Sequence, residues 1–299
     1  MARRKVAQLN ALIAVDKPLG ITSHDVVARV RRAVGERRVG HAGTLDPLAT
    51  GVMVVGIGQA TRLLGMLALD TKSYVAQIRF GCETVTDDAE GEVSHEAPVD
   101  ACLFEEPLAR DALARLLRDQ MQTPPAYSAI SVDGVRSYKR ARSGEDVELA
   151  PRPVTVHAAE LYGIAREDGA PVWTVGFTVS KGTYIRALAR DLGRAVGSAA
   201  HLGALRRTVS GSIGIERVLR SMGSPSMPPV LRHSTPSPRS ACRCSRSTRL
   251  RFQMFSAARW LRRAASLPAE GVRVALVQEN TLVALGEVTG GCVRPRDVF

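Results

Sequence analysis

The sequence predicts an α+β fold with a mixed or antiparallel sheet. Segments with the alternating pattern of strands and segments with helical spacing follow one another without the regular strand–helix–strand order of a parallel α/β protein. The chain has 299 residues, of which 45% are hydrophobic and only 4% are aromatic. A chain of this length can bury a large core, and aliphatic side chains must fill most of it.

Strands are predicted where every second side chain is hydrophobic or where a short hydrophobic run occurs. The clearest case is the segment 73–81, in which Tyr74, Ile78 and Phe80 fall on one face together with an alanine. The other predicted strands lie at residues 11–16, 52–58 and 172–180, and in a C-terminal hairpin formed by residues 272–278 and 282–288.

Helices are predicted in three places where hydrophobic residues recur at helical spacing. The first covers residues 24–35, carries four valines on one face and can be capped by Thr22 or Ser23. The other two cover residues 108–119 and residues 186–197, and the last of these ends in a glycine.

Two longer stretches lack such a pattern. Residues 84–100 are acidic and are predicted to form a loop. Residues 122–146 contain two adjacent prolines and a run of basic residues, and they are predicted to form an extended arm. Because Tyr127 and Tyr138 stand among these basic residues, the arm favours RNA binding over a merely solvated face.

The net charge of +12 invites a nucleic-acid interpretation, but its distribution is uneven. Residues 217–269 hold eleven arginines with no lysine and no carboxylate. The remaining 30 basic and 29 acidic residues nearly cancel one another. RNA binding by the main domain must therefore rest on local basic patches.

The arginine-rich segment 217–270 has two interpretations, and composition does not choose between them. Residues 221–247 alone contain eight serines and five prolines, which is typical of a disordered basic linker. The same composition, with its lack of carboxylates, also fits translation of GC-rich coding sequence in a shifted frame, followed by recovery of a strand pattern near Gly271. Resequencing the gene decides between them.

Other features argue against several classes of protein. No hydrophobic run approaches the roughly 20 residues of a membrane helix, and the N-terminus has no secretion signal, so we expect a cytoplasmic protein. Five scattered cysteines do not form a disulfide framework. Cys242 and Cys244 lack a second ligand pair, so we expect no metal site.

The segment with the densest functional signal is RVGHAGTLDPLATG, from Arg38 to Gly51. Three glycines let its backbone approach a ligand closely, and Pro47 biases Asp46 toward an extended conformation. Spacing alone leaves two interpretations open, a rigid functional loop and an ordinary turn in which Asp46 bonds to its own backbone.

The stretch GHAGTLDPLATG at residues 40–51 resembles the catalytic motif of the TruB family. Further blocks that resemble this family follow in the family's order and together cover about residues 11–216. They are DKPLGITS at 16–23, SYV at 73–75, PPAYSA at 124–129 with Gly134, Arg136, Tyr138 and Ala141-Arg142 after it, SKGTYIR at 180–186, and His201 with Leu205, Arg206 and Arg207.

This resemblance implies a cofactor-free tRNA pseudouridine synthase that isomerises uridine 55 of the T-loop. It implies a pseudouridine synthase fold over residues 1–216, into which the RNA-binding arm 122–146 is inserted. Members of the family commonly end in a PUA-like module. Residues 271–299 are predicted to be a small β remnant of that module, truncated or disrupted by the segment 217–270.

The resemblance also implies a role for each matched residue of the site. Asp46 is the essential carboxylate, and Arg186 keeps it ionised and oriented. Tyr74 stacks on the flipped uracil, which Tyr184 and Leu205 also contact, while His41 fills the place that the base leaves. The predicted RNA contacts are Lys17, Arg136, Tyr138, Lys139, Arg140, Arg142, Arg206 and Arg207.

Each of these roles has an ordinary structural alternative. Tyr74 can be a core aromatic residue, Arg186 a structural or phosphate-binding arginine, and His41 a loop residue bonded to backbone. The sequence also departs from the family at Ala42, where many members have threonine, and at Ser131, where lysine is common. The first is a small change that should leave activity in place, and the second removes one possible phosphate contact.

Two rival functions remain at this stage. One is a related isomerase that acts on another RNA, such as the dyskerin branch, which works with a guide RNA and has a full PUA domain. The other is an RNA-folding chaperone that grips tRNA without chemistry. We expect a monomer whose partner is the T-arm of tRNA, with no membrane contact.

Overall fold

The computed structural model describes residues 9–68, 70–128, 130–132, 134–143, 145, 149–218, 261–262, 273–278, 281–289 and 292–298. Nearly all of the segment 217–270 lies outside the described residues, so the choice between a linker and a shifted frame is not addressed by the structure. Within the described part of the chain, no helix is long and apolar enough to cross a membrane.

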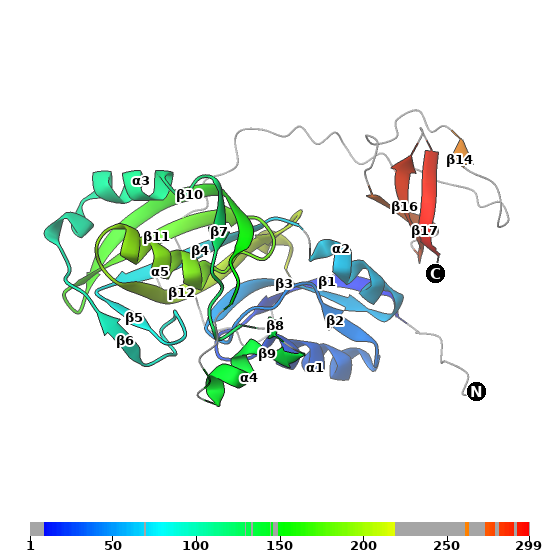
Figure 1. The fold of residues 1–299 in the computed structure, drawn as a ribbon. Helices are drawn as coiled ribbons and strands as arrows, with labels where there is room; N and C mark the ends of the chain where they lie inside the picture. The colour runs from blue at the N-terminus through cyan, green and yellow to red at the C-terminus, as the bar shows by residue number, and fades with distance from the viewer. Residues whose placement is uncertain are drawn as a thin grey trace.

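One mixed sheet forms the centre of the protein and confirms the predicted fold class (Figure 1). Its strands run antiparallel to their neighbours except β3 and β12, which pair in parallel. In spatial order the strands are β1 (Ala11–Lys17), β3 (Ala49–Ile57), β12 (Ala200–Ser210), β4 (Lys72–Phe80), β11 (Ala170–Val179), β10 (Arg152–Glu167) and β7 (Asp119–Gln122); β2 (Val39–His41) pairs with β3, and β13 (Ile213–Gly214) pairs with β12.

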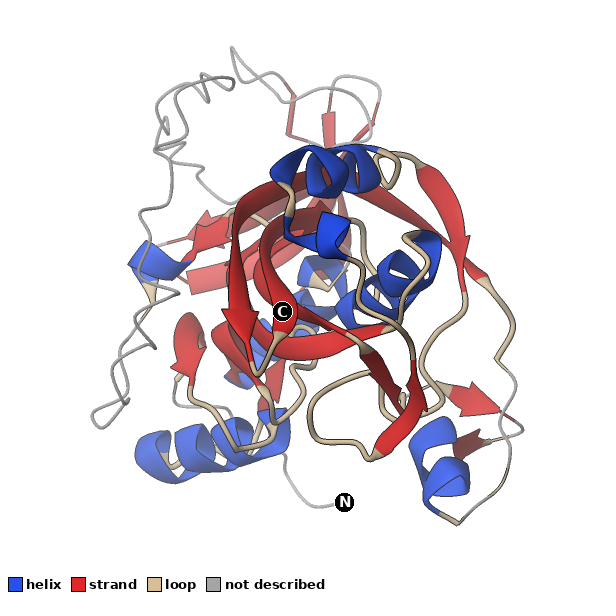
Figure 2. Cartoon of the chain, turned by 90° about the vertical axis from the view of Figure 1, so that its left-hand side faces the viewer, coloured by secondary structure: helices blue, strands red, loops and turns tan. Residues whose placement is uncertain are grey.

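The helices are α1 (Ser23–Val34), α2 (Leu64–Leu67), α3 (Glu106–Ala114), α4 (Ser137–Arg142) and α5 (Ile185–Ala195), with 3-10 turns at Gly58–Leu63, Ala101–Phe104 and Ile215–Arg217. Helices α1, α2, α3 and α5 lie beside the curved layer of strands, and α4 lies on the arm next to β8 (Ser131–Val132) and β9 (Val135–Arg136) (Figures 1 and 2). The first helix is capped by Thr22, whose side chain accepts from the Asp25 amide while the Asp25 carboxylate accepts from the Thr22 amide.

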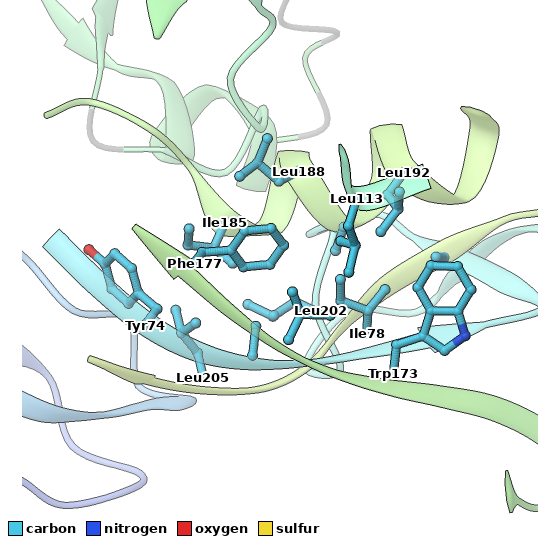
Figure 3. Close-up of a cluster of buried hydrophobic side chains, with 14 of the residues drawn as sticks. Tyr74, Ile78, Leu113, Trp173, Phe177, Ile185, Leu188, Leu192, Leu202 and Leu205 are labelled. Carbon is cyan, nitrogen blue, oxygen red and sulfur yellow. The ribbon is translucent and has the colours of Figure 1, made fainter. Parts of the chain in front are cut away.

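Three hydrophobic clusters hold helices to the sheet. In the smallest of them, Leu64 and Leu67 of α2 pack against Val52 and Val54 of β3. At the β1–β3 end, Val26 and Val27 of α1 pack with Met53 and Val55 of β3. At the other end, α3 and α5 pack on β4, β10, β11 and β12 (Figure 3). The alternation predicted for the segment 73–81 is confirmed, because alternate residues of β4 are buried along its whole length.

Three regions differ from the expectation. The acidic stretch 84–100 was expected to be a loop, but part of it belongs to a hairpin of β5 (Cys82–Thr84) and β6 (Val93–Glu96), and Asp87 and Asp88 in its turn are buried. The arm is not simply extended, since it contains the short strands β8 (Ser131–Val132) and β9 (Val135–Arg136) and then α4. Neither β10 nor β12 was predicted as a strand.

The predicted C-terminal hairpin is confirmed. Strand β15 (Arg273–Gln278) pairs antiparallel with β16 (Thr281–Thr289). They form a four-stranded sheet with β17 (Cys292–Val298) and β14 (Leu261–Arg262).

Candidate active site

The loop that carries Asp46 connects β2 to β3, and buried side chains hold its backbone on both sides of the carboxylate. Before Asp46, the Ser23 hydroxyl donates to the Leu45 carbonyl at 3.0 Å and accepts from the Leu45 amide at 2.9 Å. After it, the Lys17 ammonium donates to the carbonyls of Ala49 at 2.6 Å and Pro47 at 3.3 Å. The position of Asp46 is therefore set by the segment 16–23.

Arg207 supports the same loop from β12. Its Nε donates to the Val52 carbonyl at 2.6 Å, and its Nη2 donates to the Gly43 carbonyl at 3.3 Å. Beside it, Gly51 has a φ of +104°, and a Cβ at that position would lie 2.1 Å from the Arg207 carbonyl oxygen. Only glycine fits this close approach of β3 and β12.

Two of the predicted phosphate contacts are wrong. Lys17 is 0% exposed and Arg207 is 1% exposed, and both cations bind backbone carbonyls inside the protein. Burial also lowers the pKa of Lys17 to about 8. Arg206 is engaged as well, because its guanidinium pairs with the Asp16 carboxylate at 2.7 Å and 3.1 Å, so Asp16 competes with any phosphate there.

The structure places Arg186 beside Asp46, although 140 positions separate them in the sequence. The Arg186 Nε lies 3.0 Å from Asp46 Oδ2. The Arg186 side chain is 7% exposed, whereas the Asp46 side chain is 39% exposed. The pair thus combines a buried, fixed guanidinium with a carboxylate that a substrate can reach.

The remaining nitrogens of Arg186 are bound to two other segments. Its Nη1 donates to the Thr86 carbonyl at 2.8 Å, and its Nη2 donates to the Tyr127 carbonyl at 3.0 Å. The Asp88 carboxylate, which is 3% exposed, also lies 3.5 Å from Nη1. Because every nitrogen has a partner, the guanidinium has one defined orientation toward Asp46.

Tyr184 precedes α5 and is held through its backbone. The Gln122 side chain accepts from the Tyr184 amide at 2.9 Å and donates to the Tyr184 carbonyl at 3.1 Å. Burial raises the pKa of the Tyr184 phenol, and the nearby Asp46 carboxylate raises it further. Tyr184 and Asp46 therefore interact electrostatically.

Tyr74 and Leu205 lie on neighbouring strands at one end of the larger hydrophobic cluster (Figure 3). Tyr74 of β4 is paired with Arg207 of β12, which is in turn paired with Gly51 of the Asp46 motif. Figure 3 shows the Tyr74 hydroxyl pointing away from the cluster. Tyr74 is thus a core residue with its polar end directed outward, and its stacking role stays a prediction.

His41 ends strand β2, and its ring packs edge-to-face against His24 with centroids 5.8 Å apart. Burial lowers the pKa of His41, and the neighbouring His24 and Arg207 lower it further. These effects favour a neutral imidazole near neutral pH. Its predicted role in filling the place of a flipped base is not tested by this geometry.

The arm carries the other predicted RNA contacts. The Tyr138 amide donates to the Ser128 carbonyl at 3.1 Å, which joins α4 to the base of the arm. Arg140 lies 3.8 Å from the Glu145 carboxylate. The side chains of Arg136, Lys139 and Arg142 lie outside the described residues, so their contacts stay predictions.

Sequence reasoning missed the acidic residues that surround Arg186. Asp87 and Asp88 lie in the acidic stretch expected to be a loop, and they are only 8% and 3% exposed. The sequence does contain a sign of this arrangement. Residues 83–88 include three acids, and the predicted helix 186–197 carries three arginines spaced four apart on one face, so the two sets can pair. Over the described part of the chain, no group of His, Cys, Asp or Glu side chains is arranged to hold a metal ion.

Comparison with known families defines the class of the protein. The family model described as "TruB family pseudouridylate synthase (N terminal domain)" matches residues 31–185. This match covers more than half of the chain and includes Asp46 and its loop. The chain belongs to the TruB family of pseudouridylate synthases.

Similar proteins agree with this assignment. The chain is 54% identical to the tRNA pseudouridine synthase B of Arthrobacter sp. over 213 residues, which cover 70% of this chain and 68% of that protein. It is also 54% identical to the tRNA pseudouridine synthase B of Streptomyces coelicolor, over 67% of each chain. Among solved structures, the chain is similar to one in an H/ACA ribonucleoprotein bound to a substrate RNA containing 2'-deoxyuridine. The TM-score is 0.51 and the sequence identity is 26%, and the match covers 72% of this chain and 51% of that chain.

Proposed function

We propose that this protein is a tRNA pseudouridine synthase that isomerises uridine 55 of the T-loop, with Asp46 as the essential carboxylate. The observation that carries this proposal is the ion pair between the reachable carboxylate of Asp46 and the buried guanidinium of Arg186. The relatives named tRNA pseudouridine synthase B support tRNA as the substrate.

The chemistry requires an ionised acid at this position. Isomerisation breaks the bond between the ribose C1' and the uracil N1, turns the freed base, and joins C1' to C5. The hydrogen on C5 is then lost to solvent as a proton while N1 gains one, so that atoms and charge balance. A carboxylate can attack the sugar or the base as a nucleophile, or stabilise positive charge at the sugar, and either covalent route remains open here.

The other residues of the site act on the uracil and on the RNA. Arg186 favours the ionised form of Asp46 and orients it. Tyr74, Tyr184 and Leu205 form the surroundings of the flipped uracil, and His41 occupies the space that the base leaves in the T-loop. Arg136, Tyr138, Lys139, Arg140 and Arg142 of the arm contact the tRNA, and the enzyme acts as a cytoplasmic monomer.

The decisive substrate test uses T-arm RNA labelled with tritium at C5 of its uridines. We expect tritium release from the T-arm stem-loop and none from a T-arm in which cytidine replaces uridine 55. Release only from a different structured RNA, such as a ribosomal fragment, would show an isomerase of another substrate. Binding of the T-arm without release would show a tRNA-folding protein that has lost the chemistry.

A further inference from the structure

Helix α5 presents a row of three arginines to the acidic hairpin β5–β6. Arg186, Arg190 and Arg194 are four residues apart and therefore lie along one face of the helix. Each pairs with a different acid from residues 83–88. The pairs are Arg186 with Asp88 at 3.5 Å, Arg190 with Asp87 at 2.8 Å, and Arg194 with Glu83 at 2.6 Å.

The two arginines nearer to the active site also hold the base of the arm. Arg186 donates to the Tyr127 carbonyl at 3.0 Å, and Arg190 donates to the Thr123 carbonyl at 3.0 Å. Arg194 is bound to Glu83 through two nitrogens, and its side chain is 59% exposed. Arg190 thus repeats the contacts of Arg186 one turn further along α5, whereas Arg194 contacts the hairpin alone.

We propose that Arg190 is a positioning residue for uridine isomerisation, because it joins the Asp87 turn to the base of the arm and thereby fixes the two carbonyls that orient Arg186. This inference rests on the proposed function. Thr86 directly precedes Asp87, and Thr123 is connected to Tyr127 through the stiff Pro124-Pro125 pair. A shift at either end of the Arg190 bridge is therefore passed to an acceptor of Arg186.

The charges of Arg190 and Asp87 are buried, so each needs the other as its compensating partner. The Asp87 and Arg190 side chains are each 11% exposed. Burial raises the pKa of Asp87 to about 6, against the opposing effect of Arg190 and Arg186, while Asp191 and Glu83 raise it further. Removal of Arg190 alone leaves a buried carboxylate without its main partner, which destabilises the fold.

The test compares Arg190→Met with Arg194→Met, because each variant removes one guanidinium from the same row. For Arg190→Met we expect kcat for tritium release from T-arm RNA to fall by about 10²-fold, the effect of a small misplacement of a catalytic group, with KM nearly unchanged. For Arg194→Met we expect kcat close to that of the wild type. Equal kcat values for the two variants would overturn the proposal.

A second comparison separates positioning from simple stability. Adding Asp87→Asn to Arg190→Met removes the uncompensated charge, so the double variant should regain thermal stability but keep the low kcat. Recovery of wild-type kcat together with stability would show that Arg190 only balances charge, and would overturn the proposal. If Arg190→Met does not fold, Arg190→Lys replaces it. Lysine keeps the charge but has one nitrogen for the three acceptors of Arg190, which are Asp87, Asp191 and the Thr123 carbonyl.

Hydrogen exchange gives a readout that does not depend on catalysis. Arg190→Met should raise amide exchange in both segments 84–91 and 123–128, whereas Arg194→Met should raise it only near Glu83. Equal exchange at 123–128 in the two variants would contradict the bridge. A wild-type protein that releases no tritium from any RNA would refute the proposed function, and the exchange comparison would still decide whether the bridge exists.

Discussion

Lys17 is fully buried, which is unusual for a lysine. It stands in the segment DKPLGITS, next to the turn that meets the Asp46 loop, and its ammonium donates to three backbone carbonyls. The cation replaces the water that these carbonyls would otherwise bind, and it draws the loop toward β1. Its contribution to the site is therefore structural, although its charge also lies close enough to Asp46 to interact with it.

This environment predicts a characteristic dependence of stability on pH. The folded state lowers the pKa of Lys17 to about 8 from its ordinary value of 10.5. Between these values the unfolded chain binds more protons than the folded one, so the free energy of unfolding rises with pH. We expect this contribution to amount to about 1 to 3 kcal/mol over that range.

Urea unfolding of the wild type and of Lys17→Met, from about pH 7 to about pH 10, measures this contribution. The difference between their unfolding free energies should grow with pH, because the methionine variant lacks the titrating group. The variant should be less stable throughout, since it leaves buried carbonyls without a donor. A difference that stays constant with pH would contradict the buried position of the ammonium.

At the scale of elements, the arm is the segment that is proposed to bind RNA through its charges. Its base is tied to the site through the Tyr127 carbonyl, which accepts from Arg186. Its basic residues lie in β9, which contains Arg136, and in α4, which contains Lys139, Arg140 and Arg142. The Tyr127 carbonyl therefore connects the proposed RNA-binding arm to the guanidinium beside Asp46.

Replacing Arg136, Arg140 and Arg142 by alanine should weaken T-arm binding and flatten its salt dependence. The slope of log binding constant against log salt should fall by about 0.7 to 0.9 for each lost phosphate contact. The control replaces Arg110 of α3 and Arg115, which directly follows α3; both are exposed and are paired with Glu106 and Asp111 of the same helix. If the arm variant kept the wild-type slope, the arm would not contact phosphates.

At the scale of the whole molecule, local patterns predicted several helices and strands but not their partners. The capped helix α1, the alternating strand β4 and the C-terminal hairpin follow from short-range rules, and all three are confirmed. Strand β12 was missed because its pattern mixes buried arginine and histidine with hydrophobic residues, and these polar side chains have partners far away in the sequence.

For the site, too, the sequence did not show which residues from distant segments contact one another. Asp46 and Arg186 were singled out by their motifs, and the fold places them together. Lys17 and Arg207 looked like phosphate contacts because their charges are normally on the surface. Asp87 and Asp88 were expected only to lie in an acidic loop. In each case the compensating partner comes from another segment, and only the tertiary structure shows it.

The central claim is that the Asp46 carboxylate performs the isomerisation. Single-turnover tritium release from T-arm RNA tests it by comparing the wild type with Asp46→Asn, which keeps the size of the side chain but not its charge, and with Asp25→Asn, a control on the exposed capping residue of α1. The account predicts release by the wild type and by Asp25→Asn, and none by Asp46→Asn, with T-arm binding retained in all three. Release by Asp46→Asn at the wild-type rate would contradict it.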